Sequence, residues 1–415
     1  MASPIQTALP LKVPAYPELL RQAAGRFGTP TFVYHEPIIR DRIDRLRAHL
    51  EGIPLRLLYA MKANSSPALL QIMRDEGLGL DAVSPGELAL ALQLGFDPGS
   101  ILYSANNLTD DEMHRAVQAG VLLNIGERSR LDKYGQAYPG SAVCLRINPN
   151  VGAGHHRHVV TAGGKTKFGI PVEELGAAIE MAHRYNLQIR GLHQHIGSGI
   201  LEAEHLWQAG HVLLEAALHL PDLDFINLGG GLGIPYRPGE AGLDFERFRE
   251  RLVGPLQTFL ARHPSPNLSI VFEPGRYLVA ESGVLLTTVN TLKEAHGRLF
   301  AGTDSGMNHL LRPALYQAYH AVYNLTNPEG PLRTYDVTGN ICESGDLLAE
   351  DRAVQTIREA DCLAVLDAGA YAMSMASTYN LRPLPAEVLH RPDGTLVQTR
   401  RRLTADELVA AWMHG

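Results

Sequence analysis

A lysine that follows an apolar segment is the first residue of this chain whose position suggests covalent chemistry. The segment 57–61 reads Leu-Leu-Tyr-Ala-Met and is followed by Lys62, Ala63 and Asn64. A cation at the end of a buried strand is costly unless it is paired, exposed or used covalently. Lysine is also the side chain that forms Schiff bases with carbonyl cofactors. We therefore take Lys62 as a candidate covalent anchor for such a cofactor.

Polar side chains and glycines recur at the ends of later strand-like segments. They are Asp81 with Ser84, Arg146 with Asn148, His193 and His195 with Ser198, Gly229-Gly230-Gly231, and Glu273-Pro274-Gly275-Arg276. A scaffold needs no charged group at the end of most of its strands, whereas barrel enzymes gather their catalytic residues at the carboxyl ends of the strands. The recurrence therefore predicts one site built from many strand ends.

Glu273 and the glycine run each allow two interpretations. Glu273 ends an apolar strand, so its carboxylate needs a partner, which is either Arg276 or the protonated ring nitrogen of a pyridine cofactor. The glycine run at 229–231 is either a tight turn or a backbone cradle for a phosphate group. Loops after the seventh and eighth strands of barrels often bind phosphate, but a turn is equally compatible with the sequence.

His193 and His195 are two residues apart on a predicted strand, so their side chains face the same side. One interpretation is a zinc site of a barrel hydrolase, although the sequence offers no obvious third and fourth ligands. A second interpretation is a hydrogen-bonded core histidine, which we favour for His193. A third places one imidazole against the ring of an aromatic cofactor. A glycine-rich stretch with His155, His156 and His158 is expected to form an exposed loop over the site.

Cys342 stands beside Glu343 in a polar stretch near the carboxyl terminus. A cysteine in such surroundings is unlike an inert buried cysteine, so Cys342 is a candidate proton donor. Cys144 and Cys362 lie in apolar strand-like segments and are expected to be packing residues. Three cysteines cannot form a disulfide framework, and their number fits a reducing compartment.

Strand-like and helix-like segments alternate from residue 55 onwards, and they must position these side chains. The expected strands are 55–61, 79–83, 100–103, 121–124, 142–147, 188–195, 224–228 and 268–273. The expected helices are 67–76, 85–94, 110–119, 129–136, 172–185, 203–220 and 245–262. Eight strands that alternate with helices predict an α/β fold with a (β/α)8 TIM-type barrel. The alternative, a doubly wound open sheet, would place one phosphate-binding turn near its first strand.

A chain of 415 residues is too long for one ordinary core, so two domains are expected. After Arg276 the pattern becomes strand-rich, with expected strands at 277–289, 300–304, 334–338, 362–366 and 396–402, and a capped helix at 404–412. We expect a barrel domain at 35–285. Residues 1–34 and 286–415 should form a second, mostly β domain that resembles a sandwich or barrel.

Composition narrows the classes of function. A net charge of −7 argues against nucleic-acid binding and suits a soluble cytosolic enzyme. The first residues show no basic segment followed by an apolar one, so we expect no secretory signal. No uninterrupted apolar run is long enough to span a bilayer. These features predict a cytoplasmic protein.

Taken in order, these motifs resemble those of the fold-type III pyridoxal-phosphate decarboxylases, and in particular the diaminopimelate decarboxylase family. The matching stretches are Tyr59-Ala60-Met61-Lys62-Ala63-Asn64, Asp81-Ala82-Val83-Ser84-Pro85-Gly86-Glu87, Arg146-Ile147-Asn148-Pro149, Lys167-Phe168-Gly169-Ile170, His195-Ile196-Gly197-Ser198-Gly199, Gly229-Gly230-Gly231, Glu273-Pro274-Gly275-Arg276, Arg312-Pro313-Ala314-Leu315-Tyr316, Cys342-Glu343-Ser344-Gly345-Asp346 and Asp367-Ala368-Gly369-Ala370-Tyr371. The resemblance covers residues 27–402, and its last three stretches separate this family from alanine racemase-like barrels.

The resemblance implies roles for the residues that match. Lys62 would hold pyridoxal 5'-phosphate covalently, Glu273 would pair with its ring nitrogen, and His195 would stack on its ring. Cys342 would protonate the carbon that loses carbon dioxide. The implied catalytic residues are Lys62, Glu273, His195 and Cys342. The other implied cofactor residues are Asp81, Arg146, Ser198, Gly230, Gly231, Gly275, Arg276 and Tyr371. The implied substrate residues are Arg276, Arg312, Tyr316, Glu343 and Tyr371. No metal is implied.

The resemblance further implies decarboxylation of meso-2,6-diaminopimelate to L-lysine and carbon dioxide, the last step of lysine biosynthesis. It also implies a homodimer in which the Cys342 loop enters the partner's site. Arg312 suits the distal carboxylate of this substrate, because arginine binds carboxylates bidentately. Related decarboxylases for carboxynorspermidine, for ornithine or arginine, or for a carrier-linked glutamate remain alternatives. So do two other classes, a metal-dependent barrel hydrolase and a non-catalytic cofactor carrier, although a carrier would need neither the second domain nor the Cys342 loop.

Overall fold

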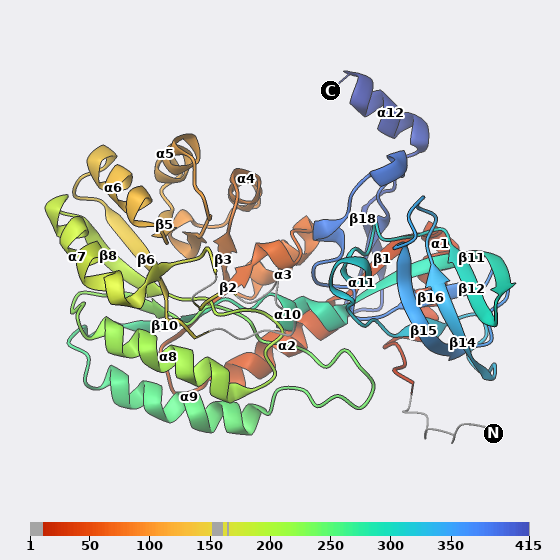
Figure 1. Ribbon diagram of the computed structural model, residues 1–415, viewed down its shortest axis with the longest axis horizontal. Helices are drawn as coiled ribbons and strands as arrows, with labels where there is room; N and C mark the ends of the chain where they lie inside the picture. The colour runs from red at the N-terminus through yellow and green to blue at the C-terminus, as the bar shows by residue number, and fades with distance from the viewer. Residues whose placement is uncertain (1–10, 152–160, 164–165, 415) are drawn as a thin grey trace. The chain divides into compact units, whose positions relative to one another are not determined.

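The computed structural model describes residues 11–151, 161–163 and 166–414, and the chain divides into two compact units (Figure 1). The barrel unit consists of Arg40–Ile234 and Gly242–Leu278. The β-rich unit consists of the chain up to Ile39, Pro235–Ala241 and Val279–Gly415. Each unit contains its own sheet.

Eight of the described strands close into a parallel ring in the barrel unit. They are β2 (Leu55–Ala60), β3 (Gly79–Ala82), β4 (Ile101–Tyr103), β5 (Leu122–Ile125), β6 (Ala142–Asn148), β8 (Gln188–His193), β9 (Phe225–Asn227) and β10 (Ser269–Phe272). The ring is closed because β10 pairs with β2 and β5 pairs with β6. This arrangement confirms the predicted (β/α)8 barrel. The short strand β7 (Ile170–Pro171) pairs with β6 outside the ring.

Helices follow most of the barrel strands and lie on the outside of the ring (Figure 1). They are α2 (Glu36–His49), α3 (Pro67–Asp75), α4 (Pro85–Gln93), α5 (Asp110–Gln118), α6 (Arg128–Ala137), α7 (Leu175–Arg184), α8 (Ala203–Ala217) and α9 (Phe245–Leu260). The short helix α10 (Arg276–Val279) follows β10 at its carboxyl end. Local signals set several starts: Ser84 caps α4, and Thr109 forms a capping box with Glu112 on α5. No helix in the described part of the chain combines the length and hydropathy that a membrane span needs.

One layer of side chains inside the barrel comes from alternate strands. Leu58 on β2, Leu102 on β4, Cys144 on β6 and Phe225 on β9 belong to one buried cluster. Gly191 on β8 makes room for this layer, because a Cβ at that position would collide with the ring of Phe225. Val271 on β10 joins the same cluster, and the fully buried Cys144 is a packing residue, as predicted.

The β-rich unit is built on a mixed sheet, which confirms the predicted second, mostly β domain. Its strands are β1 (Thr31–His35), β11 (Gly283–Ala295), β12 (Arg298–Thr303), β13 (Val322–Asn324), β14 (Leu332–Thr338), β15 (Leu347–Gln355), β16 (Cys362–Val365), β17 (Ala386–His390) and β18 (Leu396–Arg400). Strand β1 is antiparallel to β11 and parallel to β17, so a strand from early in the chain lies inside the later sheet.

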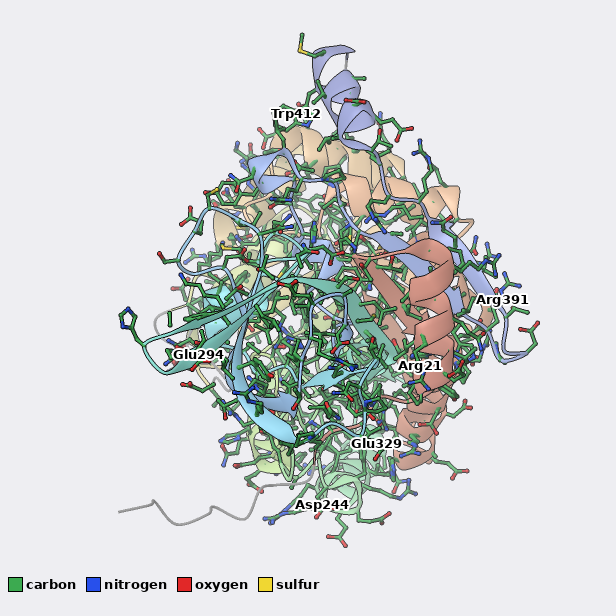
Figure 2. The ribbon with its side chains drawn as sticks, turned by 90° about the vertical axis from the view of Figure 1, so that its right-hand side faces the viewer. Arg21, Asp244, Glu294, Glu329, Arg391 and Trp412 are labelled. Atoms are coloured by element: carbon green, nitrogen blue, oxygen red, sulfur yellow. The ribbon has the colours of Figure 1, made fainter. Side chains whose placement is uncertain are left out.

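Three helices accompany this sheet. Helix α1 (Pro17–Phe27) contributes Leu20 and Ala23 to the core of the unit, and the other two are α11 (Arg312–Tyr316) and α12 (Ala405–His414). Charged side chains lie at the surface of the unit, as Figure 2 shows for Arg21, Glu294, Glu329 and Arg391.

The structure corrects the strand that the sequence predicts at 277–289. Its first residues form α10 and a 3-10 turn η5 (Ala280–Ser282), and β11 begins only at Gly283. The apolar run at 277–280 is buried, and periodicity cannot distinguish a buried helical turn from a buried strand. The prediction also lacks β13, β15 and β17. In β15 the charged residues 350–352 interrupt the apolar pattern.

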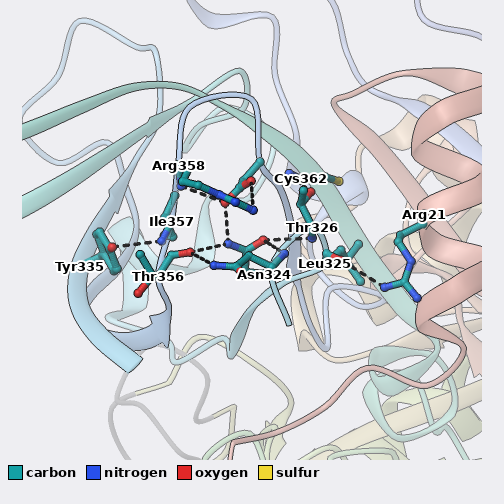
Figure 3. Close-up of polar contacts among 11 residues, drawn as sticks. Arg21, Asn324, Leu325, Thr326, Tyr335, Thr356, Ile357, Arg358 and Cys362 are labelled. Carbon is teal, nitrogen blue, oxygen red and sulfur yellow. Dashed lines mark hydrogen bonds and ion pairs between the residues drawn. The ribbon is translucent and has the colours of Figure 1, made fainter. Parts of the chain in front are cut away.

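A buried asparagine joins two turns of the β-rich unit (Figure 3). Nδ2 of Asn324, at the end of β13, donates to Oδ2 of Asp361 at 2.8 Å and to the carbonyl oxygen of Thr356 at 3.1 Å. Oδ1 of Asn324 accepts from the N–H of Thr326 at 3.0 Å. The side chain therefore satisfies backbone groups of both turns, which stabilises the approach to β16.

Candidate active site

Lys62 lies directly after β2, in a 3-10 turn formed by Met61–Ala63 (η1). Its Nζ donates to Oδ2 of Asp81 on the neighbouring strand β3, at 2.7 Å. Burial raises the pKa of Asp81, and the charge of Lys62 opposes that rise. Oδ1 of Asp81 is buried and has no hydrogen-bond partner among the described residues. The ion pair therefore fixes the lysine amine at the carboxyl end of the barrel.

Glu273 follows β10 and is buried with His193 and Asn227. Its Oε2 lies 3.0 Å from Nε2 of His193, and its Oε1 accepts from Nδ2 of Asn227 at 2.7 Å. Burial alone would raise the pKa of Glu273, but His193 and Lys62 outweigh it and lower the pKa to about 2. The carboxylate is therefore ionised and is held from two sides.

The glycine run after β9 approaches His195. The N–H of Gly230 donates to Nδ1 of His195 at 3.1 Å, so the neutral ring carries its proton on Nε2. Burial lowers the pKa of His195, and the charges of Lys62 and Arg146 lower it further. A Cβ on Gly230 would collide with the carbonyl oxygen of Glu273. Close packing requires glycine at this position, and the imidazole next to it stays neutral.

Ser198 and Arg276 meet at the same end of the barrel. Nη2 and Nε of Arg276 lie 3.0 Å and 3.3 Å from Oγ of Ser198. The Ser198 loop is joined to the glycine run because the N–H of Ile200 donates to the carbonyl oxygen of Gly231 at 2.9 Å. Gly275 lies against the end of β2, where a Cβ would come within 3.1 Å of a side chain of that strand. These groups form a corner with a guanidinium and closely packed backbone, which is compatible with an anion.

A cavity of about 350 Å³ lies at the carboxyl ends of the barrel strands. It is lined by Lys62, Asp81, Val83, Ser104, Asn106, Arg146, Thr161, Lys167, Phe168, His193, His195 and Glu273. The guanidinium carbon of Arg146 lies 4.8 Å from the ring centre of Phe168. A cavity of about 480 Å³ at the opposite ends of the strands is larger, but none of the predicted site residues lines it. The smaller cavity is therefore the candidate active site.

Two residues that bind Glu273 are absent from the predicted site. His193 is a hydrogen-bonded core histidine, as its sequence context favours, but its partner is a site residue. Asn227 also accepts from the N–H of Gly229 at 2.8 Å and so joins the glycine run to the carboxylate. Because His193 and His195 share one strand face, their spacing could have indicated that His193 belongs to the site. Nothing in the sequence singles out Asn227.

Glu87 is a third residue near the site that the sequence does not reveal. Its Oε2 accepts from the N–H of Val83 at 2.8 Å, and burial raises its pKa to about 7. It lies three residues after Ser84, the N-cap of α4, which is the position of the acidic residue in a capping box. The stretch with His155, His156 and His158, predicted to be a loop over the site, lies outside the described residues.

Five predicted site residues belong to the β-rich unit. Arg312 begins α11 and is 1% exposed, and Tyr316 ends the same helix. Cys342 and Glu343 are exposed in the loop between β14 and β15. Tyr371 follows β16 and has a φ of 55°. Of the predicted barrel residues, Lys62, Asp81, Arg146, His195 and Glu273 line the cavity, while Ser198, Gly230, Gly231, Gly275 and Arg276 do not. The other five predicted residues belong to the β-rich unit.

A buried carboxylate organises the Cys342 loop. Asp346 accepts from the N–H of Ile341 and from the N–H of Met307, both at 2.6 Å. A Cβ on Gly306 or Gly339 would collide with its carboxylate oxygens. Asp346 therefore clamps the loop that carries Cys342 to the turn after β12.

Comparisons with known proteins supply the family. Residues 37–280 match the pyridoxal binding domain of the pyridoxal-dependent decarboxylases. Over 397 residues the chain is 43% identical to the diaminopimelate decarboxylase of Methanothermobacter thermautotrophicus. The aligned region covers 94% of this chain and 92% of that protein. Its identity to the Escherichia coli K12 diaminopimelate decarboxylase is 37%, over 95% of this chain and 96% of that protein.

A solved structure agrees with these relatives. The crystal structure of the diaminopimelate decarboxylase from Helicobacter pylori, complexed with L-lysine, superimposes with a TM-score of 0.87 and 30% identity. The match covers 95% of this chain and 100% of that chain. Sequence and fold therefore agree over both units. The chain belongs to the pyridoxal-dependent decarboxylases, in the group that includes the diaminopimelate decarboxylases.

Proposed function

We propose that this protein decarboxylates meso-2,6-diaminopimelate to L-lysine and carbon dioxide with pyridoxal 5'-phosphate as cofactor, the last step of lysine biosynthesis. The observation that carries the proposal is that Lys62 and the ionised Glu273 line one cavity at the carboxyl ends of the barrel strands. The relatives that match along nearly the whole chain are diaminopimelate decarboxylases, which supports the choice of substrate.

The residues around the cavity fit pyridoxal phosphate. Asp81 has a buried oxygen without a partner among the described residues, and the packed backbone of Gly230 leaves no room for a side chain. Lys62 would hold the cofactor covalently through Nζ, and Ser198, Gly231 and Arg276 would bind its phosphate. The residues proposed to surround it are Asp81, Arg146, His195, Ser198, Gly230, Gly231, Glu273, Gly275, Arg276 and Tyr371. In the described part of the chain, no three His, Cys, Asp or Glu side chains are grouped as metal ligands.

Each residue of the catalytic set has a physical role in this proposal. When bound, pyridoxal phosphate supplies a ring that accepts the electron pair left on the substrate carbon as carbon dioxide leaves. The ionised Glu273 stabilises a proton on a nitrogen that faces it. His195 offers a neutral imidazole face, because its pKa is lowered by burial. The Cys342 thiol delivers the proton that replaces the lost carboxylate.

The substrate has a second carboxylate and a second amine at its far end. We propose that five residues bind the substrate, namely Arg276, Arg312, Tyr316, Glu343 and Tyr371. A guanidinium suits the distal carboxylate and the Glu343 carboxylate suits the distal amine. We further propose a homodimer in which the Cys342 loop completes the site of the partner subunit. The three free thiols support a cytoplasmic location.

Turnover of defined substrates tests the proposal. Purified protein with added pyridoxal phosphate is incubated separately with meso-diaminopimelate, carboxynorspermidine, ornithine, arginine and a carrier-linked glutamate. We expect L-lysine from meso-diaminopimelate, and turnover of the others at least about a hundredfold slower, because they lack either the distal carboxylate or the distal amine at that spacing. Efficient turnover of another member of the set, without lysine formation, would refute the assignment.

A further inference from the structure

Arg312 is a buried cation in the β-rich unit. It is 1% exposed and is the largest of the fully buried side chains described. Arginine stays protonated in proteins, so this charge persists after burial. A buried charge is costly unless its donors are used, and the way in which the fold uses them determines what Arg312 can bind.

His320 is a neutral group that contacts the guanidinium. Nη1 of Arg312 lies 2.8 Å from Nε2 of His320. Arginine can only donate, so Nε2 must be the acceptor, and the ring proton is then on Nδ1. Nδ1 lies 2.8 Å from the carbonyl oxygen of Leu366, which accepts that proton. A backbone carbonyl at the end of β16 therefore fixes the tautomer that lets His320 hold Arg312.

Tyr236 is another neutral group that contacts the guanidinium. The guanidinium carbon of Arg312 lies 4.6 Å from the ring centre of Tyr236, within the range of a cation–π contact. The rings of Tyr236 and His320 are 5.5 Å apart and 74° from parallel. The edge-on pair fixes the orientation of the guanidinium, and neither ring carries a negative charge.

A nearby carboxylate is engaged elsewhere. Asp367 also experiences the charge of Arg312, but its Oδ2 lies 2.6 Å from Nζ of Lys12. Lys12 donates in addition to the carbonyl oxygen of Pro235 at 3.0 Å. The lysine thus compensates the charge of Asp367, and neither His320 nor Tyr236 brings a negative charge to Arg312.

We propose that His320 is a positioning residue which, with Tyr236, orients Arg312 as a charged receptor for the distal carboxylate of the substrate. This inference rests on the proposed function and deepens it. A neutral acceptor fixes the guanidinium without neutralising it, whereas a carboxylate in the place of His320 would compete with the substrate for Arg312. His320 therefore selects substrates that carry a carboxylate at the far end.

Two ligands that differ only in one carboxylate separate this role from a structural one. L-Lysine keeps the distal carboxylate of diaminopimelate, and cadaverine is the same diamine without it. Inhibition of the holoenzyme by each is measured for the wild type and for His320→Leu, His320→Gln and His320→Glu. His309→Gln is the matched control, because His309 is also buried in the β-rich unit but binds Ser305 and the carbonyl oxygen of Pro383.

For His320→Leu we expect the KM for diaminopimelate and the inhibition constant of L-lysine to rise about tenfold or more, with a smaller fall in kcat. Cadaverine inhibition should change less than about twofold, because cadaverine has no group for Arg312. His320→Gln keeps a neutral acceptor and should restore lysine binding to within about threefold of wild type. His320→Glu should weaken lysine binding more than His320→Leu.

Equal weakening of lysine and cadaverine in His320→Leu would overturn the inference, and so would lysine binding in His320→Gln that is no better than in His320→Leu. If His320→Leu does not fold, the other two variants still test the inference. Stronger lysine binding by His320→Glu than by His320→Gln would contradict the proposed role of His320. The proposed function fails separately, if the wild type releases no lysine from diaminopimelate, and this inference then fails with it.

Discussion

Two buried carboxylates at the barrel ends show how neighbouring residues set the protonation of a single side chain. Burial raises the pKa of both Asp81 and Glu273 when it acts alone. Asp81 has Lys62 beside it and keeps a raised pKa, whereas His193 and Lys62 together lower the pKa of Glu273 to about 2. Carboxylates that are shifted in opposite directions within one cavity indicate different roles.

Glu273→Gln tests the role of the ionised carboxylate. The amide keeps the shape but removes the negative charge, so kcat should fall by about a hundredfold or more while bound cofactor is retained. Steady-state kinetics and the cofactor absorbance of the purified variant measure both effects. Glu180→Gln, at an exposed position on α7, is the control and should leave kcat unchanged. A Glu273→Gln enzyme with wild-type kcat would contradict the role.

Glu87 gives a pH-dependent prediction. Its pKa is raised from 4.5 to about 7, so the carboxyl binds a proton more tightly in the folded than in the unfolded state. Its contribution to stability is complete below about pH 4.5 and is lost as the pH rises through 7. Glu87→Gln should therefore melt together with the wild type at pH 5 and about 2–4 °C higher at pH 8. Equal melting temperatures at pH 8 would contradict the raised pKa.

At the scale of elements, the Cys342 loop depends on Asp346. The carboxylate accepts from two backbone amides that belong to different loops, and two glycines leave room for it. Asp346 is buried, while Cys342 and Glu343 are exposed, so the loop is fixed from beneath and presents both side chains outward.

Asp346→Ala should release this loop without affecting the cofactor site in the barrel. We expect faster amide hydrogen exchange at Ile341 and a fall in kcat of about tenfold or more, because a proton donor that is out of place loses most of its effect. Asp351→Ala, at an exposed position on β15, serves as the control. Faster exchange with an unchanged kcat would show that the loop is dispensable for turnover.

The barrel was the most predictable part of the fold, for a physical reason. Eight apolar segments separated by amphipathic ones leave few arrangements other than a closed parallel sheet, and all eight predicted strands are present. The β-rich unit was less predictable because its strand pairing joins distant segments, such as β1 with β11 and β17. Lys62 and Glu273 stand out as charges at the ends of apolar strands, whereas the contact of His193 with Glu273 spans 80 positions and depends on the register of the barrel.

At the scale of the whole molecule, the proposed homodimer predicts that subunits complement each other. Lys62→Ala and Cys342→Ala variants should each be inactive alone. If the Cys342 loop of one subunit serves the site of the other, subunit exchange creates mixed dimers with one intact site, and activity should return to about a quarter of wild type. Activity that stays at the level of the single variants after subunit exchange would contradict the shared site.

Covalent mapping of the cofactor tests the central claim most directly. Borohydride reduction of the purified holoenzyme, followed by peptide mass analysis, locates the lysine that holds pyridoxal phosphate. Lys62 and Lys167 both line the cavity, so the experiment has a real alternative within the same site. The ion pair of Lys62 with Asp81 and the anionic Glu273 predict a pyridoxyl adduct on Lys62, and none in the Lys62→Ala variant. An adduct on Lys167, or wild-type turnover by Lys62→Ala, would contradict the account.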